Sequence, residues 1–241
     1  MNIAFIIFAV IGGYLLGSIS TAVIAGKLLH GIDVREHGSG NAGATNVIRV
    51  LGWKTGIPVM VIDIGKGWLA AYLPVIFELA GKESGLLITL QIISGTAAII
   101  GHVYPVFAGF RGGKGVGTTF GILLALHPWL TLSCVGVFLA VLFITGYVSA
   151  SSMTAGIAFP ILLFTVFNTP SLVFKIFSVV VAVALVCQGL VAVIHPAGVV
   201  GREANIGSAY AAIFSWAVCR YVAAPCYILL LSHKPVLGGV G

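Results

Sequence analysis

The chain has 241 residues, of which 59% are hydrophobic and 7% are charged, and its formal net charge is +6. A water-soluble domain carries charge on about a quarter of its residues, so neither a soluble enzyme fold nor a disordered chain fits this composition. Nucleic-acid binding is also excluded, because Lys and Arg do not cluster among aromatic residues. We therefore expect a single integral membrane domain over residues 1–241.

Seven apolar stretches predict an all-α fold of membrane-spanning helices, since no segment alternates apolar and polar residues as a barrel strand would. They lie at residues 3–25, 56–79, 86–107, 116–126, 129–145, 152–167 and 173–194. A spanning helix needs about 20 residues, so the fourth must borrow residues from the preceding loop or lie where the membrane is thin. An eighth apolar segment, 209–231, lies within a C-terminal extension, 209–241, but carries Arg220 and Pro225 near its middle. Whether it spans the membrane stays open.

The distribution of Lys and Arg among the connecting loops predicts the orientation of the chain. With the N-terminus outside, the outer loops receive Lys82, Lys175 and, if residues 209–231 span, Lys234. The inner loops then hold the larger group, which is Lys27, Arg35, Arg49, Lys54, Arg111, Lys114 and Arg202. This excess satisfies the positive-inside rule. The polar, Gly-rich segments 30–55, 108–115, 146–152 and 195–208 then all lie on the cytoplasmic face, where we expect the function to reside.

Residues 37–49 form a polar segment that we interpret as a candidate anion-binding loop. Gly38, Gly40 and Gly43 permit positive φ angles, which lets backbone N–H groups converge on an anion. Side-chain donors and one fixed positive charge would come from Ser39, Asn41, Thr45, Asn46 and Arg49. The alternative, that Gly and Asn only form turns in a solvated loop, stays open.

Residues 109–119 form a second candidate anion site. Gly112 and Gly113 precede Lys114, and the segment leads into an apolar helix. Free N–H groups at a helix N-terminus, the helix dipole and one ammonium group together favour an anion. A nucleotide-binding P-loop is excluded, because Gly115 stands where that motif requires Ser or Thr. The alternative is that these glycines allow tight helix packing while the basic residues fix the topology.

Two ionisable residues, Asp63 and Lys66, lie within the second predicted span. They are three positions apart and therefore share one face of the helix, where they can pair. Ionisable groups inside a membrane helix suggest a functional site, but a structural ion pair between this helix and its neighbours is an equal alternative.

Further polar side chains are expected on the same membrane face. Ser149, Ser151 and Ser152 crowd one turn, where they either donate to a ligand or cap the following helix. His195 ends the seventh span, and a lone His is more often a structural residue than a catalytic one. The cysteines lie singly in apolar segments without metal-ligand spacing. We expect neither a metal nor a cofactor.

Two long motifs connect the sequence to a known family. The first is Gly38-Ser-Gly-Asn-Ala-Gly-Ala-Thr-Asn46 followed by Arg49, and the second is Gly101-His-Val-Tyr-Pro-Val-Phe107 running into Phe110-Arg-Gly-Gly-Lys-Gly115. Two shorter matches are Asp63-Ile-Gly-Lys-Gly67 and Tyr147-Val-Ser149. In this order, over roughly the first 150 residues, the chain resembles the bacterial acyl-phosphate:glycerol-3-phosphate acyltransferases (PlsY).

The C-terminal part departs from the pattern of that family. His195 is kept, but Pro196 and Gly198 replace an expected Arg and Asn, and a segment with Glu203 follows. Gly146 stands where a basic residue is usual, and the apolar segment near the C-terminus is additional to a seven-helix pattern.

The resemblance implies transfer of an acyl group from acyl phosphate to the 1-hydroxyl of glycerol-3-phosphate, giving lysophosphatidic acid and phosphate in phospholipid synthesis. It implies that Ser39, Arg49 and Lys114 hold phosphates and that Gly112 and Gly113 offer backbone N–H groups. It also implies that Ser149 or Ser152 hydrogen-bonds the substrate. His195 with Glu203 would orient or deprotonate the attacking hydroxyl.

The resemblance also implies a multi-pass protein of the bacterial plasma (inner) membrane with its active face in the cytoplasm. Its partners would be acyl phosphate, glycerol-3-phosphate, the lipid bilayer and the enzyme that makes acyl phosphate, without coenzyme A or nucleic acid. Two alternatives stay open, a polytopic anion transporter and a diverged acyltransferase that uses another acceptor.

Overall fold

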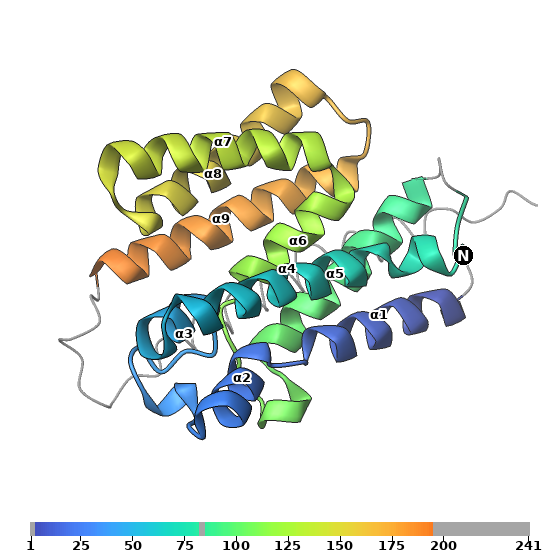
Figure 1. Ribbon diagram of the computed structural model, residues 1–241. Coiled ribbons are helices and arrows are strands. Elements are labelled where there is room, and N and C mark those ends of the chain that lie inside the picture. The colour runs from blue at the N-terminus through green and yellow to red at the C-terminus, as the bar shows by residue number, and fades with distance from the viewer. Residues whose placement is uncertain (1–2, 82–84, 195–241) are drawn as a thin grey trace, which may run out of the picture.

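The computed structural model describes residues 3–81 and 85–194, and over these residues the regular structure is helical (Figure 1). In chain order the elements are α1 (Ile3–Gly17), α2 (Thr21–His30), η1 (Val34–Glu36), α3 (Ala44–Leu51), α4 (Trp53–Ile76), α5 (Gly85–Val103), η2 (Val106–Ala108), α6 (Val116–Leu126), α7 (Pro128–Thr145), α8 (Val148–Leu162), η3 (Leu163–Phe167) and α9 (Leu172–Ile194). Segment 209–231, His195 and Glu203 lie outside the described residues.

Several of these helices are long and apolar enough to cross a membrane. In the described part of the chain the candidate spans are Ile3–His30, which contains both α1 and α2, and the segments Trp53–Ile76, Gly85–Ala108, Pro128–Thr145 and Ala150–Phe167. Two shorter apolar helices, Val116–Leu126 and Leu172–Cys187, lie at the positions of the fourth and seventh predicted spans. The predicted all-α integral membrane fold is thereby confirmed.

The first predicted span is not one continuous helix. α1 ends at Gly17 and α2 begins at Thr21, with a non-helical break between them. A long side chain from α4 fills the break, because the Nζ of Lys66 donates to the carbonyl oxygen of Ile19 at 2.7 Å. A backbone carbonyl released from a helix needs a donor in a membrane, since water is excluded there. The carbonyl oxygen of Ile19 also accepts from the backbone N–H of Thr21 at 3.1 Å, so the break is supported both locally and by a contact between helices.

α6 stays short and takes no residues from the loop before it. Its N-cap, Gly115, has φ of 78°, a left-handed conformation that stops the helix from extending backward. Eleven residues at about 1.5 Å each give roughly 16 Å, too little to cross a bilayer. The expectation that this helix would be lengthened at the expense of the loop is wrong.

Glycines let α6 pack closely on α4. A Cβ at Gly121 would overlap the backbone of α4 at Ile64, and a Cβ at Gly67 would overlap the backbone of α6 at Thr118. α1 and α5 approach through Gly13 and Gly17 in the same way. Small residues at such crossings are the usual means of packing membrane helices, and they leave α4, α5 and α6 as the centre of this half of the molecule.

The substitution Gly67→Ala is expected to destabilise the protein by about 1–3 kcal/mol, because the added methyl group must push α6 away from α4. Gly65→Ala is the matched control, since Gly65 lies on the same helix with open space around it. That variant should stay within about 0.5 kcal/mol of the wild type. Thermal unfolding in detergent measures both, and equal stabilities would contradict the close packing.

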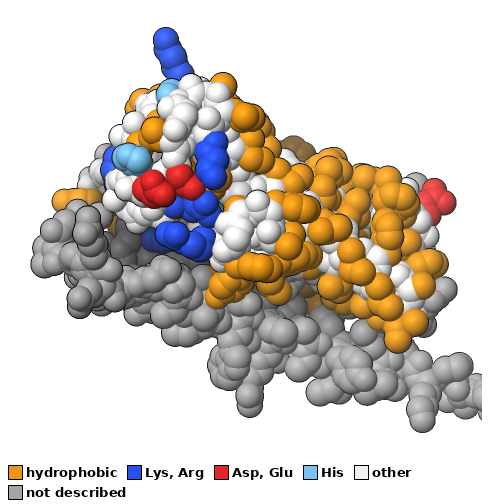
Figure 2. Space-filling model, turned by 90° about the horizontal axis from the view of Figure 1, so that it is seen from below, with side chains coloured by type: hydrophobic (Ala, Val, Ile, Leu, Met, Phe, Trp, Pro, Cys, Tyr) orange, Lys and Arg blue, Asp and Glu red, His pale blue; other side chains and the backbone are white. Residues whose placement is uncertain are grey.

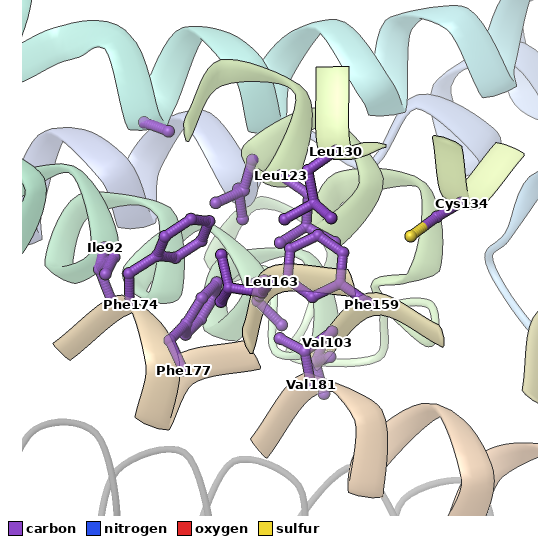
Figure 3. Close-up of a cluster of buried hydrophobic side chains, with 13 residues drawn as sticks. Ile92, Val103, Leu123, Leu130, Cys134, Phe159, Leu163, Phe174, Phe177 and Val181 are labelled. Carbon is purple, nitrogen blue, oxygen red and sulfur yellow. The ribbon is translucent and has the colours of Figure 1, made fainter. Parts of the chain in front are cut away.

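The second half of the fold packs α7, α8 and α9 against α5 and α6. Large side chains from these helices meet in one buried cluster, in which Phe159 of α8, Phe177 of α9 and Leu130 of α7 are almost fully buried (Figure 3). Many apolar side chains outside the cluster are exposed, as expected of a surface that faces lipid.

The polar connections gather at one end of the helix bundle. α2, α3, the α7–α8 turn and the described end of α9 all lie at this end in Figure 1. Figure 2 shows the Lys, Arg and His side chains and most of the acidic ones grouped there, whereas hydrophobic side chains dominate the rest of the coloured surface and one acidic group lies at the opposite end. The prediction that the polar segments share one face holds for those that the structure describes.

Candidate functional site

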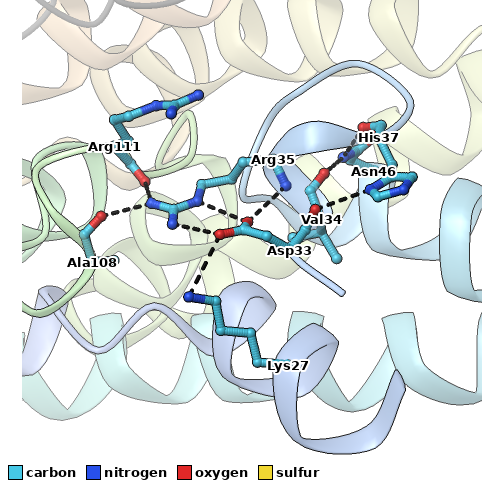
Figure 4. Close-up of polar contacts among 8 residues, drawn as sticks. All are labelled: Lys27, Asp33, Val34, Arg35, His37, Asn46, Ala108 and Arg111. Carbon is cyan, nitrogen blue, oxygen red and sulfur yellow. Dashed lines mark hydrogen bonds and ion pairs between the residues drawn. The ribbon is translucent and has the colours of Figure 1, made fainter. Parts of the chain in front are cut away.

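Two polar loops at this end are joined by one arginine. We call residues 31–43 loop 1 and residues 104–115 loop 2. Arg35 of loop 1 donates from one terminal nitrogen to the carbonyl oxygens of Ala108 and Arg111 in loop 2, at 2.6 and 3.0 Å (Figure 4). Its other nitrogens bind the Asp33 carboxylate at 2.9 and 2.7 Å. We call this arrangement the Asp33–Arg35 brace.

The brace is mostly shielded from solvent and stays ionised. The side chains of Arg35 and Asp33 are only 13% and 15% exposed. The Arg35 guanidinium holds the pKa of the Asp33 carboxyl well below its usual range, and Lys27, 3.7 Å away, adds a smaller effect in the same direction. Asp33 in turn raises the pKa of Arg35. A bidentate charged pair of this kind fixes geometry as well as adding energy.

Loop 1 is shaped from inside by Asn46, the last residue of the first motif. Its Nδ2 donates to the carbonyl oxygens of Val34 and His37, and its Oδ1 accepts from the backbone N–H of Ser39. The side chain is 2% exposed and both amide hydrogens are used. Asn46 therefore holds the loop in shape, and we do not keep it among the proposed phosphate-binding residues.

The other predicted anion-binding residues of this segment face outward. Ser39, Thr45 and Arg49 are exposed, and Asn41 is partly buried. Arg49 lies in α3, whose buried side packs on the rest of the fold through Asn46 and Val47. The buried side of this short helix thus fixes the position of a cation on its open side.

In loop 2 the structure contradicts one predicted role. The backbone N–H groups of Gly112 and Gly113 donate to the carbonyl oxygens of Val103 and His102, both at 3.1 Å. They cap the end of α5 and are not offered to an anion, because the carbonyls of a helix C-terminus need donors of their own. The assignment of these two amides to phosphate is therefore wrong.

The glycines of loop 2 are needed for close approach. A Cβ at Gly113 would overlap the His102 ring and come within 2.8 Å of the carbonyl oxygen of Ala42 in loop 1. Gly113 is thus a second point, besides the brace, at which the two loops touch. Lys114 follows immediately with an exposed side chain, and partial desolvation by the surrounding loop lowers its pKa.

The N-terminus of α6 lies directly after Lys114. Its N-cap residue is Gly115, which has no side chain to cap the first-turn amides. The first-turn amides of a helix and the positive end of its dipole favour an anion. This helix end and Lys114 are the features on which the sequence analysis based the second candidate anion site.

Asp63 and Lys66 form the ion pair that their spacing predicts. The Nζ of Lys66 lies 2.9 Å from the Oδ1 of Asp63, and each side chain is 5% exposed. The hydroxyl of Thr21 donates to the same carboxylate oxygen at 3.2 Å. The pair ties α4 to the break between α1 and α2.

The serines of the α7–α8 turn separate into different environments. Ser151 is buried, and its hydroxyl donates to the carbonyl oxygen of Tyr147 at 2.8 Å within α8, so it is not a helix cap. Ser152 is partly buried. The side chain of Ser149, like His195 and Glu203, lies outside the described part of the chain. Among the described residues, no three His, Cys, Asp or Glu side chains are grouped as a metal site would require.

A family model described as glycerol-3-phosphate acyltransferase matches residues 7–198. The chain belongs to the glycerol-3-phosphate acyltransferase family. A glycerol-3-phosphate acyltransferase of Chlorobaculum tepidum is 51% identical over 159 residues, covering 64% of this chain and 68% of the relative. One of Chlorobium phaeobacteroides is 51% identical over 154 residues, covering 62% and 66%, respectively. The matches thus span about two thirds of the length of these relatives.

Two solved structures of PlsY, an integral membrane glycerol 3-phosphate acyltransferase, share this fold. The glycerol 3-phosphate form has a TM-score of 0.67 and 35% identity, covering 84% of this chain and 97% of that chain. The lysophosphatidic acid form has a TM-score of 0.65 and 33% identity, covering 85% and 98%. The predicted resemblance to PlsY is confirmed, and family membership makes the chain an acyltransferase of phospholipid synthesis, which favours an enzyme over an anion transporter.

The Asp33–Arg35 brace of this acyltransferase was missed by sequence reasoning. Arg35 entered the sequence analysis only as one of the charges that orient the chain, because an acidic and a basic residue two positions apart carry no specific signal. Its partners in loop 2 are more than 70 residues away and are backbone carbonyls, which have no residue-type signature.

Proposed function

We propose that this chain transfers an acyl group from acyl phosphate to the 1-hydroxyl of glycerol-3-phosphate. The products would be lysophosphatidic acid and inorganic phosphate. Membership of the glycerol-3-phosphate acyltransferase family supports the acceptor and the acyl transfer. The solved PlsY relatives, in a glycerol 3-phosphate form and a lysophosphatidic acid form, support the same acceptor and product. Acyl phosphate as the donor rests on the motif resemblance.

The Asp33–Arg35 brace is the structural observation that supports placing this reaction at the two loops. It joins two loops that lie next to two cations: Arg49 belongs to α3, which follows loop 1, and Lys114 belongs to loop 2. Both proposed substrates carry phosphate, and cations that are fixed in advance stabilise developing charge without reorganising. We propose that Ser39, Arg49 and Lys114 hold these phosphates.

Direct attack is the mechanism that we propose. The 1-hydroxyl oxygen forms a bond to the acyl carbonyl carbon, the bond from that carbon to the phosphate oxygen breaks, and phosphate leaves with its electron pair. His195, assisted by Glu203, accepts the hydroxyl proton, and Ser149 or Ser152 hydrogen-bonds the substrate. Catalysis then comes from positioning and charge neutralisation, since no nucleophile with an adjacent base and orienting group is recognised.

We further propose that the site faces the cytoplasm of a bacterium from its plasma membrane. The excess of Lys and Arg at the polar end supports this orientation. Glycerol-3-phosphate would arrive from the aqueous side and the alkyl chain of the donor from the bilayer. The enzyme that makes acyl phosphate is then a natural partner, because its product is both amphipathic and reactive.

The test is an assay of the detergent-purified protein with palmitoyl phosphate, with and without glycerol-3-phosphate. We expect phosphate release that depends on the acceptor and equals the lysophosphatidic acid formed. Intact palmitoyl phosphate in the presence of acceptor would contradict the proposed donor. Release that another polyol phosphate supports better would favour a diverged acceptor, which the replacements at Pro196 and Gly198 make worth assaying side by side.

A further inference from the structure

A buried polar cluster lies between the helix break and loop 2. Its centre is the Asp63–Lys66 pair, in which Lys66 reaches the carbonyl oxygen of Ile19 and Asp63 accepts from Thr21. On the other side, the Nδ1 of His102 lies 3.7 Å from the same Asp63 oxygen. His102 is 6% exposed and lies in the last turn of α5. The cluster thus connects α2, α4 and α5.

His102 leads directly from this cluster to loop 2. Its carbonyl oxygen accepts the N–H of Gly113 at 3.1 Å, and its ring occupies the space where a side chain at Gly113 would lie. Gly113 is the residue before Lys114. A shift of the His102 ring or backbone therefore moves the N-terminal side of Lys114.

Asp63 also supports the other side of Lys114. Gly117, in the first turn of α6, lies against the side chain of Asp63, so that a Cβ there would be 3.4 Å from the Asp63 Cβ. Lys114 therefore lies between Gly113, which is packed next to the His102 ring, and Gly117, where an added Cβ would just reach Asp63. His102 and Asp63 come from different helices, α5 and α4, and neither belongs to the Asp33–Arg35 brace.

Stability alone does not explain why these two buried residues are charged. Apolar side chains of similar volume can replace a buried ion pair at little cost, whereas removal of one partner strands the other charge. What the ionised pair adds is direction, because the carboxylate takes one geometry that accepts from Thr21 and Lys66 together and places its Oδ1 3.7 Å from the Nδ1 of His102.

We infer that the buried Asp63–Lys66 pair, acting through His102, positions Lys114 for the phosphate of the substrate. The inference rests on the proposed function, in which Lys114 is the cation that binds phosphate. Asp63, Lys66 and His102 are positioning residues that contact neither substrate. The effect of the pair on turnover should then depend on whether Lys114 is present.

The test is a double-mutant cycle with the apolar pair Asp63→Leu and Lys66→Met, with and without Lys114→Ala. We expect the apolar pair to lower kcat/KM about tenfold when Lys114 is present and less than about twofold when it is absent. Ser94→Ala is the matched control, because it removes a buried 2.7 Å hydrogen bond from α5 to the carbonyl oxygen of Ala70 in α4. Its effect should be the same in both backgrounds.

Hydrogen exchange provides a second measurement that needs no substrate. The N–H groups of Gly112 and Gly113 are hydrogen-bonded in the wild type, and we expect the apolar pair to speed their exchange by about tenfold or more. Ser94→Ala should leave it unchanged. If the wild type has no acyltransferase activity, the proposed function fails, while the exchange rates still decide whether the pair positions loop 2.

Should the apolar pair not fold, His102→Leu replaces it in both measurements, because it removes the imidazole ring that lies between Asp63 and Gly113 and leaves the ion pair intact. A folded variant whose loss of activity is equal in both Lys114 backgrounds would overturn the inference. Unchanged exchange at Gly112 and Gly113 in a folded variant would overturn it as well.

Discussion

Replacing Lys114 with alanine is expected to lower kcat/KM for acyl transfer by about 10²–10³-fold, the usual cost of removing one donor that stabilises charge in a transition state. Lys114 follows the loop 2 glycines and directly precedes the N-cap residue of α6. No neutral side chain there can replace its charge. Phosphate release from palmitoyl phosphate in the presence of glycerol-3-phosphate measures the effect.

Lys54→Ala is the matched control for this prediction. Lys54 is another exposed cation, in the first turn of α4, but it belongs to neither loop. Its removal should change kcat/KM by less than about twofold. Near-normal turnover of the Lys114→Ala protein would exclude Lys114 from phosphate binding, and equal losses in both variants would point to a general effect of surface charge.

Replacing Arg35 with glutamine is expected to destabilise the protein by about 3 kcal/mol, because it leaves the shielded Asp33 carboxylate without its main partner. Loop 2 also loses both hydrogen bonds from the guanidinium, so kcat/KM should fall together with stability. Unfolding in detergent and the acyl-transfer assay measure the two effects.

Lys27→Met is the control for the brace, since Lys27 contacts the same carboxylate at 3.7 Å but is 58% exposed. An exposed ion pair contributes little, so this variant should lose less than about 1 kcal/mol. If the two variants were equally stable, the brace would not hold the loops together.

The pH dependence of the brace follows from the lowered pKa of Asp33. A carboxyl whose pKa is lower in the folded state stabilises the fold above its unfolded value, and this contribution is lost as pH falls toward the folded value. The stability difference between wild type and Arg35→Gln should therefore be constant at neutral pH. It should shrink only at acidic pH, where Asp33 is protonated first in the Arg35→Gln protein and then, at its lowered pKa, in the wild type.

The positions of the spans could be predicted from the sequence because long apolar runs have few other interpretations. The i, i+3 spacing likewise predicted the Asp63–Lys66 pair. The break at residues 18–20 could not be predicted, since it is satisfied by Lys66 from another helix. A hydropathy profile contains no information about a contact between two helices.

The site was predictable at the level of residue types and less so at the level of atoms. Lys114 and Arg49 lie exposed near the loops where the sequence suggested an anion site. The backbone amides of Gly112 and Gly113 were assigned to phosphate, whereas in the structure they cap α5. A sequence shows where glycine occurs but not which carbonyl oxygen lies nearby. The burial of Asn46 could not be predicted for a similar reason, because a short polar side chain suits a ligand site and a turn equally well.

The gathering of the described polar loops at one end of the bundle has a consequence for the route of the lipid. An acyl transfer at that end would keep every phosphate in contact with the same aqueous compartment, and only alkyl chains would enter the hydrocarbon. The newly made single-chain lipid could then diffuse laterally into the adjacent leaflet without its head group crossing the bilayer.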